Sequence, residues 1–314
     1  MGSCLTVIIP VLNAMPYLPE ALASLEAQTF RDFQVCLWDN GSTDGSVEEV
    51  RRWIPGRLKG RVVSGNPLPL HECLARMVKE ARTEFVARMD GDDICFSERF
   101  QLQLEAMRSD TNLGIVGGQC PMIDSAGKPT GKSHPGPLAH ENIVTEMMFR
   151  SALTHPALMF RREAVLKAGN YSIPKPVEDL DLYLRMARFC RFRNLSDEVL
   201  RYRIHAQSIC QSDLEGQQKL VVEVVANYSK AIFGISNDEF LALRARRSKC
   251  AMVLFLKSAA YRSRRSLGRF LRIACSPSFV FVARCMTAQN DLLSKTIYRL
   301  LDGGSGFFAK TEPV

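Results

Sequence analysis

Three acidic residues surround Gly91 in the segment M-D-G-D-D, which directly follows the mostly apolar run 85–89. The run predicts a buried strand, so the carboxylates of Asp90 and Asp92 are expected at the carboxyl edge of a sheet, where open α/β sheets bind ligands. Such oxygen ligands suit Mg²⁺ or Mn²⁺, which are often shared with substrate phosphates. The segment predicts a site for a divalent cation and a diphosphate, with Arg88 as a further phosphate contact. A solvated acidic turn has the same pattern.

A second group of carboxylates opens a helix predicted over 178–189, in the segment V-E-D-L-D-L-Y. Acids in a first helical turn stabilise the helix macrodipole, so their position alone does not indicate a site. A displacement at a diphosphate site nevertheless requires a carboxylate that accepts a proton from the attacking hydroxyl. Glu178 and Asp179 stay open as candidates for this base, whereas Asp181, two residues further on, is expected to point elsewhere on the helix.

Two polar turns are expected at the same edge of the sheet as the acidic turn. The first, P-V-L-N at 10–13, ends a strand predicted over 5–10, and the second, D-N-G-S-T-D at 39–44, follows a strand predicted over 33–38. Asp39 can accept a hydrogen bond from the N–H of a pyrimidine base, with a turn-forming role as the alternative.

Two histidines and two arginines lie in or beside further predicted strands. His155 stands before a proline, and His205 follows the last predicted strand, over 199–204. Both histidines are candidates for the donor site, and His205 is a candidate metal ligand or phosphate contact, although a lone histidine is more often an ordinary, partly buried residue. Arg201 and Arg203 share one face of the strand and are candidates for phosphate binding.

Apolar runs alternate with helix-period segments through the first half of the chain, the pattern of a parallel sheet with crossover helices. Besides the strands above, the sequence predicts a strand over 58–64 and helices over 17–28, 44–53, 68–82 and 97–109. A loop or hairpin over 120–137, a strand over 157–160 and a helix over 161–168 follow, and beyond about 213 the pattern is all-helical. The sequence thus predicts an α/β domain over 1–212 and a helical region over 213–314.

In series, these segments resemble the family 2 glycosyltransferases of the GT-A fold, inverting enzymes that use nucleotide-diphosphate sugars. The matching stretches span roughly residues 5 to 210 in the family's order: V-I-I-P-V-L-N, W-D-N-G-S-T-D, A-R-M-D-G-D-D-I, T-H-P-A-L-M-F-R-R-E-A-V, V-E-D-L-D-L-Y-L-R-M and R-Y-R-I-H-A-Q-S. The resemblance implies a Rossmann-like, mainly parallel central sheet flanked by helices, with an α-helical C-terminal extension. It also implies metal-dependent transfer of a sugar, from a UDP-sugar above all, to a hydroxyl of a glycan or lipid-linked glycan of the bacterial polysaccharide or lipopolysaccharide type.

The resemblance also assigns roles to individual residues. The donor-binding set that it implies is Pro10, Val11, Asn13, Asp39, Arg88, Asp90, Gly91, Asp92 and His205. Within that set, Asp90, Asp92 and His205 would hold Mn²⁺ or Mg²⁺, and Asp179 outside it would be the catalytic base. The sequence departs from the family where Asn40 replaces a more usual Asp, and where the segment after Asn66 lacks the usual Asn-containing helix start, so it does not indicate the donor sugar.

The chain has 314 residues and a formal net charge of +8, and its basic residues concentrate in one segment. Between 240 and 275 there are ten Lys or Arg residues and no Asp or Glu, so the rest of the chain is nearly neutral. Basic helices with apolar faces dock on anionic membranes, and packing of these helices on the catalytic domain is the alternative. The hypothesis is a cytoplasmic protein, with peripheral attachment to the inner face of the cell membrane.

Two other classes of protein remain as rivals. A phosphatase of the haloacid dehalogenase type also places D-x-D after a strand, but it requires a hydroxyl residue shortly afterwards, where this chain has Ile94, and its acids follow the first strand rather than the fourth. A non-catalytic module that binds anionic surfaces is the second rival, with nucleic acid not expected because no nucleic-acid motif is present. The ten cysteines form no C-x-x-C pair, which favours a reducing compartment.

Overall fold

The computed structural model describes residues 3–134, 136–148, 150–173, 176–206, 214–234, 236–238 and 240–241. The chain divides into two compact units, Met1–Tyr228 and Ser229–Val314. The sheet and the acidic residues singled out above belong to the first unit. The predicted domain boundary between 212 and 213 stays a prediction.

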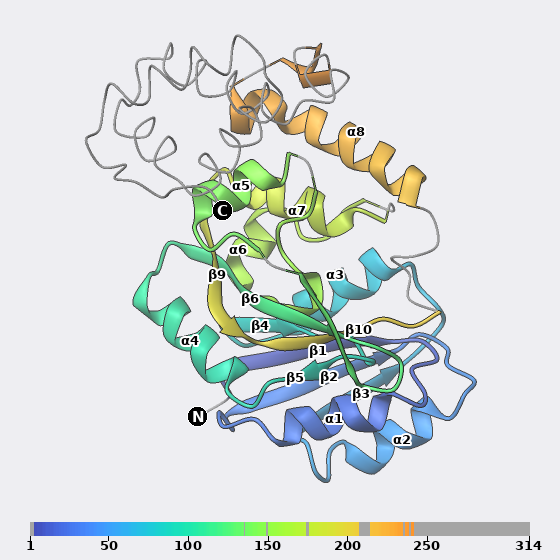
Figure 1. Ribbon diagram of the computed structural model, residues 1–314. Helices are drawn as coiled ribbons and strands as arrows, with labels where there is room; N and C mark the ends of the chain where they lie inside the picture. The colour runs from blue at the N-terminus through green and yellow to red at the C-terminus, as the bar shows by residue number, and fades with distance from the viewer. Residues whose placement is uncertain are drawn as a thin grey trace, which may run out of the picture. The chain divides into compact units, whose positions relative to one another are not determined.

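Four parallel strands form the first half of the sheet, in the order β3-β2-β1-β4 (Figure 1). They are β1 (Leu5–Val11), β2 (Phe33–Asp39), β3 (Gly60–Ser64) and β4 (Phe85–Arg88). β1 is buried on both faces, as expected of a continuous apolar run in a parallel sheet covered by helices. The register pairs Val11 with Asp39 and Ile8 with Arg88, so the loops that follow these three strands meet at one edge of the sheet.

Helices connect and cover these strands. They are α1 (Leu18–Glu26), α2 (Ser46–Trp53), α3 (Leu70–Glu80) and α4 (Arg99–Ser109). Figure 1 shows α1 and α2 on one face of the strands and α3 on the other. The buried stripe of α1, which includes Leu18, Leu22 and Leu25, packs into the same core as the apolar residues of β1 and α4, which explains why an amphipathic segment forms a helix there.

The second half extends the sheet to ten strands of mixed direction. The remaining strands are β5 (Ile94–Cys95), β6 (Leu113–Ile123), β7 (Pro129–His134), β8 (Met159–Arg161), β9 (Arg191–Glu198) and β10 (Leu200–Arg203), and the helical elements are α5 (His140–Glu146), η1 (His155–Ala157), α6 (Arg162–Lys167) and α7 (Glu178–Met186). β8 joins the two halves because it lies antiparallel between β4 and β6. The predicted fold class, a mostly parallel α/β sheet flanked by helices, is confirmed.

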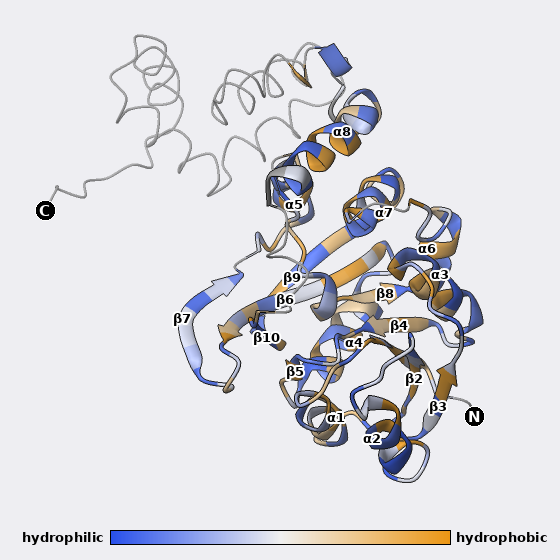
Figure 2. Cartoon of the chain, turned by 90° about the vertical axis from the view of Figure 1, so that its right-hand side faces the viewer, coloured by the Kyte–Doolittle hydropathy of each residue, from blue (hydrophilic) through white to orange (hydrophobic). Residues whose placement is uncertain are grey.

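The segment 120–137, predicted as a loop or hairpin, contains a hairpin. Residues 120–123 are the end of strand β6, and β7 pairs antiparallel with them. Earlier in β6, Gly117 serves close packing, since a Cβ there would lie 2.3 Å from Oδ1 of Asn194 on β9. Figure 2 shows the contrast in hydropathy between the hydrophilic β7 and the apolar strands β4 and β8.

The first part of the C-terminal extension forms helix α8 (Leu214–Phe233), as predicted. Nearly all of the basic segment 240–275 lies outside the described residues. Among the described helices, none combines the length and the apolar character that crossing a bilayer requires. The six cysteines within the described part, Cys4, Cys36, Cys73, Cys95, Cys120 and Cys190, are all free.

Candidate active site

The acidic turn forms directly after β4, where Asp90, Asp92 and Asp93 have carboxylate oxygens within 4.8 Å of one another. Gly91 allows this turn to lie against the loop after β1, since a Cβ there would stand 3.1 Å from the Cβ of Ala14 and 3.3 Å from Val11. The structure thus brings the predicted carboxylates together at the carboxyl edge of β4. Asp93, which the sequence analysis had not assigned, joins the cluster.

Charge and burial oppose ionisation of this cluster. Burial raises the pKa of Asp90 to about 6, the Arg88 guanidinium opposes that rise, and Asp92 adds to it. Burial and the negative charges of Asp92 and Asp90 raise the pKa of Asp93 well above its usual range. Arg88 forms an ion pair with Asp90 at 2.6 Å, and Oδ2 of Asp93 is buried without a hydrogen-bond partner among the described residues. A divalent cation held by these oxygens would relieve the repulsion, so the donor set fits Mg²⁺ or Mn²⁺.

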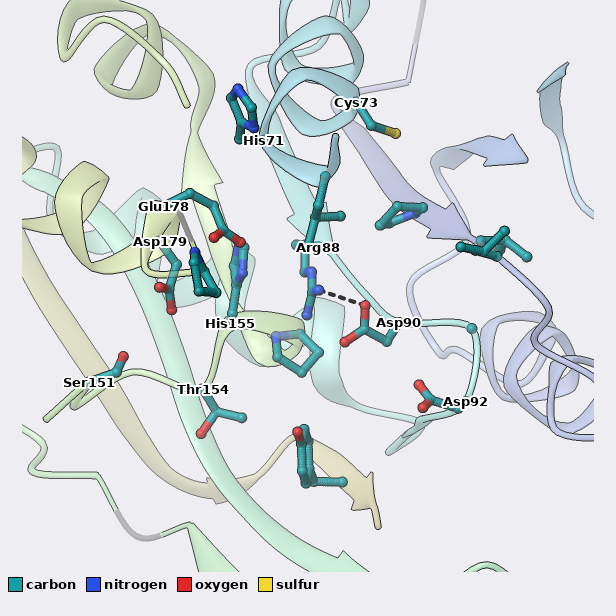
Figure 3. Close-up of a pocket in the computed structure, with 18 of the residues that line it drawn as sticks. His71, Cys73, Arg88, Asp90, Asp92, Ser151, Thr154, His155, Glu178 and Asp179 are labelled. Atoms are coloured by element: carbon teal, nitrogen blue, oxygen red, sulfur yellow. Dashed lines mark ion pairs between the residues drawn. The ribbon is translucent and has the colours of Figure 1, made fainter. Parts of the chain in front are cut away.

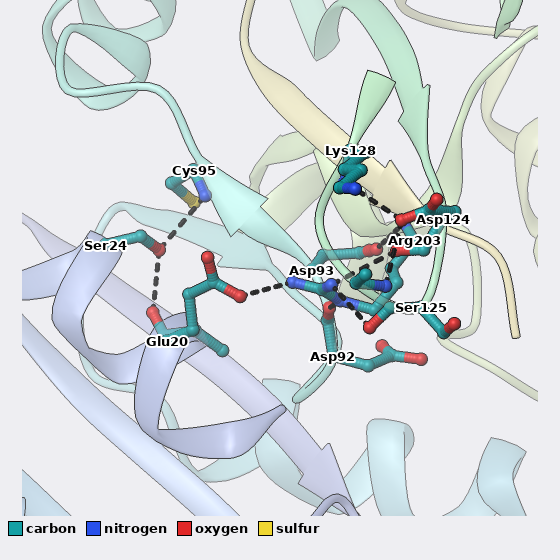
Figure 4. Close-up of polar contacts among 11 residues, drawn as sticks. Glu20, Ser24, Asp92, Asp93, Cys95, Asp124, Ser125, Lys128 and Arg203 are labelled. Atoms are coloured by element: carbon teal, nitrogen blue, oxygen red, sulfur yellow. Dashed lines mark hydrogen bonds and ion pairs between the residues drawn. The ribbon is translucent and has the colours of Figure 1, made fainter. Parts of the chain in front are cut away.

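Arg203 on β10 fixes the position of the acidic turn (Figure 4). Its backbone N–H donates to Asp93 Oδ1 at 2.9 Å, and its Nε donates to the carbonyl of Asp92 at 2.7 Å. The remaining guanidinium nitrogens bond the Asp124 and Ser125 carbonyls of the β6–β7 hairpin and, at 2.5 Å, Glu20 of α1. Because its side chain is 1% exposed, the prediction that Arg203 binds phosphate is wrong.

His205 stands beside this turn. Its Nε2 lies 2.8 Å from Oδ2 of Asp92, and its ring lies 4.8 Å from the ring of Tyr17. His205 therefore lies next to one of the two predicted metal-binding aspartates, and its own role as a metal ligand stays a prediction. Arg201, by contrast, is exposed and places its guanidinium over the Phe96 ring at 4.6 Å, away from the carboxylates.

The two polar turns after β1 and β2 hydrogen-bond to each other. Asn13 accepts the N–H of Thr43 at 2.9 Å, and its own N–H donates to the Ser42 hydroxyl at 2.9 Å. Asn13 has a φ of 52°, in the left-handed region that Asn tolerates better than most residues. Asp44 accepts the N–H of Met15 at 2.8 Å and so connects the same two turns. These bonds fix the two turns relative to each other.

Asp39 is less available than the sequence analysis expected. Its carboxylate accepts the N–H groups of Gly41 at 3.3 Å and Ser42 at 3.1 Å, which is the turn-forming role considered as the alternative. Asp39 does not line the pocket, whereas the adjacent Asn40 does, and Asn40 also bonds the Leu68 backbone through both ends of its side-chain amide. The expected contact of Asp39 with a base stays a prediction.

The second carboxylate pair opens α7 on the other side of the pocket. Burial, and after it the negative charge of Asp179, raises the pKa of Glu178 to about 7, and burial raises the pKa of Asp179. Arg88 opposes both rises. Figure 3 shows its guanidinium between Asp90 and the Glu178–Asp179 pair, so one buried cation faces both groups of acids.

Three aromatic or imidazole side chains lie beneath this pair. His155 Nε2 is 2.8 Å from the hydroxyl of Tyr171, and its ring stands edge-on to that of Tyr183. Burial and Arg88 lower the pKa of His155 well below its usual range, so the imidazole is neutral at neutral pH. The Tyr183 hydroxyl is buried with no partner among the described residues. Sequence reasoning singled out His155 but missed both tyrosines, which look like ordinary core residues in a linear pattern.

One pocket with a volume of about 940 Å³ joins the two groups of acids. The predicted site residues that line it are Pro10, Val11, Asn13, Arg88, Asp90, Gly91, Asp92, Asp179 and His205. Residues that the sequence analysis did not assign also line it, among them Tyr17, Asn40, His71, Ser151, Thr154, Tyr202 and Gln217. Both groups of acids thus line the same cavity.

Solved structures share the fold of this chain. The structure of Staphylococcus aureus TarS residues 1–349 in complex with UDP-GlcNAc has a TM-score of 0.56, with 18% identity over 82% of this chain and 81% of that one. The mannosyltransferase PcManGT from Pyrobaculum calidifontis, in complex with GDP-Man and Mn²⁺, has a TM-score of 0.54, with 17% identity over 96% and 85% of the two chains. The fold is the GT-A fold.

The family follows from the sequence comparisons. The model of glycosyl transferase family 2 matches residues 6–168, about half of the chain, and the protein belongs to that family. A curated relative, the O-antigen biosynthesis glycosyltransferase WbnJ of Escherichia coli, is 27% identical over 67% of this chain and 83% of its own length. The protein is therefore a glycosyltransferase, as the sequence analysis predicted. Glu178 and Asp179 lie beyond the end of the family match.

Proposed function

We propose that this glycosyltransferase transfers a sugar with inversion from a nucleotide-diphosphate sugar, in the first place a UDP-sugar, to a hydroxyl of a glycan or lipid-linked glycan. The observation that carries the proposal is the single pocket between Asp90–Asp92 and Glu178–Asp179. It offers a place for a donor diphosphate at one end and a buried carboxylate for the acceptor at the other. The printed titles of TarS and PcManGT name bound sugar nucleotides, which supports the same ligand class here.

On the donor side, Asp90, Asp92 and His205 are the proposed ligands of Mn²⁺ or Mg²⁺. A cation bound there neutralises charge on the diphosphate leaving group. The chain itself orients the donor: Asn13 and Asn40 line the pocket from turns that hydrogen bonds already hold, and Arg88 adds a fixed positive charge beside Asp90. Preformed contacts of this kind position a substrate without further ordering of the chain.

On the acceptor side, Asp179 is the proposed general base, with Glu178 as the second candidate. Burial raises the pKa of the Asp179 carboxyl, which makes its ionised form a stronger proton acceptor than an exposed aspartate. A single base that deprotonates the attacking hydroxyl, with direct displacement at the anomeric carbon, gives inversion. Neutral His155, together with the buried Tyr171 and Tyr183, helps to exclude water from this end of the pocket.

The acceptor is proposed to be a growing polysaccharide. This rests on the relative WbnJ, whose printed name assigns it to O-antigen biosynthesis. Attachment to the inner face of the cell membrane through 240–275 stays a hypothesis, because that segment lies outside the described residues. Deletion of everything after Ser236 should then reduce binding to vesicles of anionic phospholipid at low salt, and unchanged binding would contradict the hypothesis.

The test of the function is hydrolysis of UDP-N-acetylglucosamine and of GDP-mannose, in which water takes the place of the acceptor. We expect slow release of UDP or GDP together with free sugar, stimulated by Mn²⁺. Asp92→Ala should abolish the stimulation, and the exposed Asp32→Ala should not. A phosphatase would instead release inorganic phosphate, and a binding module would release nothing. Either result, repeated over a panel of UDP- and GDP-sugars, would contradict the proposal.

A further inference from the structure

A buried carboxylate lies on the far side of α7 from the proposed base. Asp181 follows Asp179 by two residues, and since each residue of a helix turns by about 100°, the two side chains point about 200° apart around the axis. Asp179 therefore faces the pocket, while Asp181 is 4% exposed and faces away from it. α7 has nine residues and rotates as one unit. Contacts that hold the Asp181 face of the helix therefore also set the direction in which Asp179 points.

Three donors hold the Asp181 carboxylate. Arg185, one turn further along α7, donates to Oδ2 through Nε at 3.0 Å and through a terminal nitrogen at 2.6 Å. The hydroxyl of Tyr228 on α8 donates to Oδ1 at 2.8 Å. Arg185 also donates to the carbonyl of Ala168, the residue after α6. A buried ion pair is stable only when its remaining oxygens are satisfied, and Tyr228 supplies the bond that Arg185 leaves unmade.

The helix that carries Tyr228 also reaches the pocket. Gln217 of α8 lines the same cavity as Asp179 and precedes Tyr228 by eleven residues in the chain. At ~1.5 Å per helical residue, the two positions are ~16 Å apart along the helix axis. One helix thus contributes a wall residue near one end and holds the base-bearing helix near the other.

We propose that Tyr228 is a positioning residue for Asp179: its hydroxyl holds Asp181 and so sets the rotation of α7 that directs Asp179 into the pocket. The proposal rests on the proposed function, in which Asp179 is the base. It makes α8, a helix well beyond the end of the family match, a working part of the catalytic site. It assigns no contact between Tyr228 and substrate.

Removal of the hydroxyl should change the direction of α7 more than the stability of the protein. Tyr228→Phe leaves Oδ1 of Asp181 buried without a donor, and the carboxylate then turns toward water. Rotation of α7 moves Asp179 out of its buried setting, which is formed by Arg88, Glu178, Tyr171 and Tyr183. Because burial is what raises the pKa of Asp179, the acidic limb of the rate profile should move to lower pH.

The experiment compares Tyr228→Phe with Ser229→Ala in the full-length chain. Ser229 is the adjacent residue on α8, is fully buried, and donates its hydroxyl to Asn237. The readout is Mn²⁺-dependent hydrolysis of UDP-N-acetylglucosamine, with GDP-mannose as the second probe, over a range of pH. For Tyr228→Phe we expect kcat about tenfold lower, KM for the sugar nucleotide within twofold, and the acidic limb at lower pH. Ser229→Ala should stay within twofold of the parent in all three.

Two results would overturn the inference. Equal kcat and equal pH profiles for the two variants would show that the hydroxyl only adds stability, and so would a lower melting temperature without a change in kcat. A double-mutant cycle of Tyr228→Phe with Asp181→Asn tests whether Tyr228 acts through Asp181. Additive effects of the two substitutions on kcat would exclude such action. Failure of the proposed function is distinct, because it would appear as full activity of Asp179→Asn whatever Tyr228→Phe does.

Discussion

The two groups of acids in the pocket are held in different ways. The acidic turn follows a central parallel strand, and Arg203 bonds it to the β6–β7 hairpin and to α1. The base-bearing α7 is a short helix, with its anchor at Asp181 completed by a tyrosine from α8. The end of the pocket at Asp90–Asp92 is thus part of the sheet, whereas the end at Glu178–Asp179 depends on helices outside the family match.

The largest expected effect is that of Asp179→Asn, which should slow turnover without weakening the binding of UDP. Asp179→Asn should lower turnover ~10²–10⁴-fold, the usual contribution of a general base, because the amide cannot accept the proton. Its affinity for UDP with Mn²⁺ should stay within about twofold, since Asp179 lies at the other end of the pocket. Initial rates and titration calorimetry measure the two quantities.

The exposed Asp197→Asn is the control for loss of a carboxylate and should leave both turnover and affinity unchanged. If Asp179→Asn weakened UDP binding as much as it slowed turnover, the two ends of the pocket would not be independent, and the comparison above would fail.

The next effect concerns the fixed end of the site. Arg203→Lys retains the charge but cannot donate to four carbonyl and carboxylate groups at once, so we expect a loss of about 3 kcal/mol in the free energy of unfolding. Binding of Mn²⁺ should weaken in parallel, because the backbone of Asp92 loses its donor. Urea denaturation and Mn²⁺ titration test this.

Arg201→Lys, on the same strand and exposed, is the matched control and should change neither quantity. Equal stability of the two variants would show that the contacts of Arg203 do not fix the acidic turn.

A third prediction concerns pH and the acceptor end. The pKa of Glu178 is about 7 in the folded protein, above its ordinary value, so the folded state binds more protons than the unfolded state between pH 5 and 7. The stabilisation is complete below the unfolded pKa and is lost as pH rises through about 7. The metal-free protein should therefore lose a few degrees of melting temperature from pH 5 to 8, at roughly 2–4 °C per kcal/mol for a domain of this size.

Glu178→Gln should reduce the fall in melting temperature between pH 5 and 8. The same substitution at the exposed Glu48 should leave that fall unchanged. A parent protein whose melting temperature rose over that interval would contradict the burial of Glu178 in solution.

The smallest effect concerns the turns of the nucleoside pocket. Asn13→Ala removes the bond to Thr43 and places a left-handed φ on alanine, at a cost of about 1 kcal/mol. UDP affinity should fall about fivefold, the equivalent of that energy.

Asn170→Ala is the matched control, because Asn170 also has a positive φ, 61°, and lies outside the pocket lining. It should lower stability alone. A similar loss of UDP affinity in both variants would show that the effect of Asn13 is one of general stability.

Linear patterns predicted which polar residues gather at the carboxyl edge of the parallel strands. Apolar strands followed by polar turns are visible in the sequence, and in a parallel sheet such turns must meet at one edge, so the order of residue types is enough to group Asp90, Asp92 and Asn13. Asp93 was not assigned because its role depends on burial. Strand β9 was not predicted, because its charged residues outnumber Phe192 and Leu195, and only pairing with β6 makes it a strand.

The sequence alone determined the alternation of strands and helices and the positions of the acids, because hydrophobic period and turn chemistry are local properties. Tertiary structure decided which charged side chains can reach a ligand and which are enclosed by other parts of the chain. Arg203 has the residue type and position of a phosphate ligand, but the hairpin and α1 enclose it, and Asp181 and Tyr228, 47 residues apart, are partners only because α7 and α8 meet. Burial and long-range pairing depend on the whole fold, so no local pattern could have shown them.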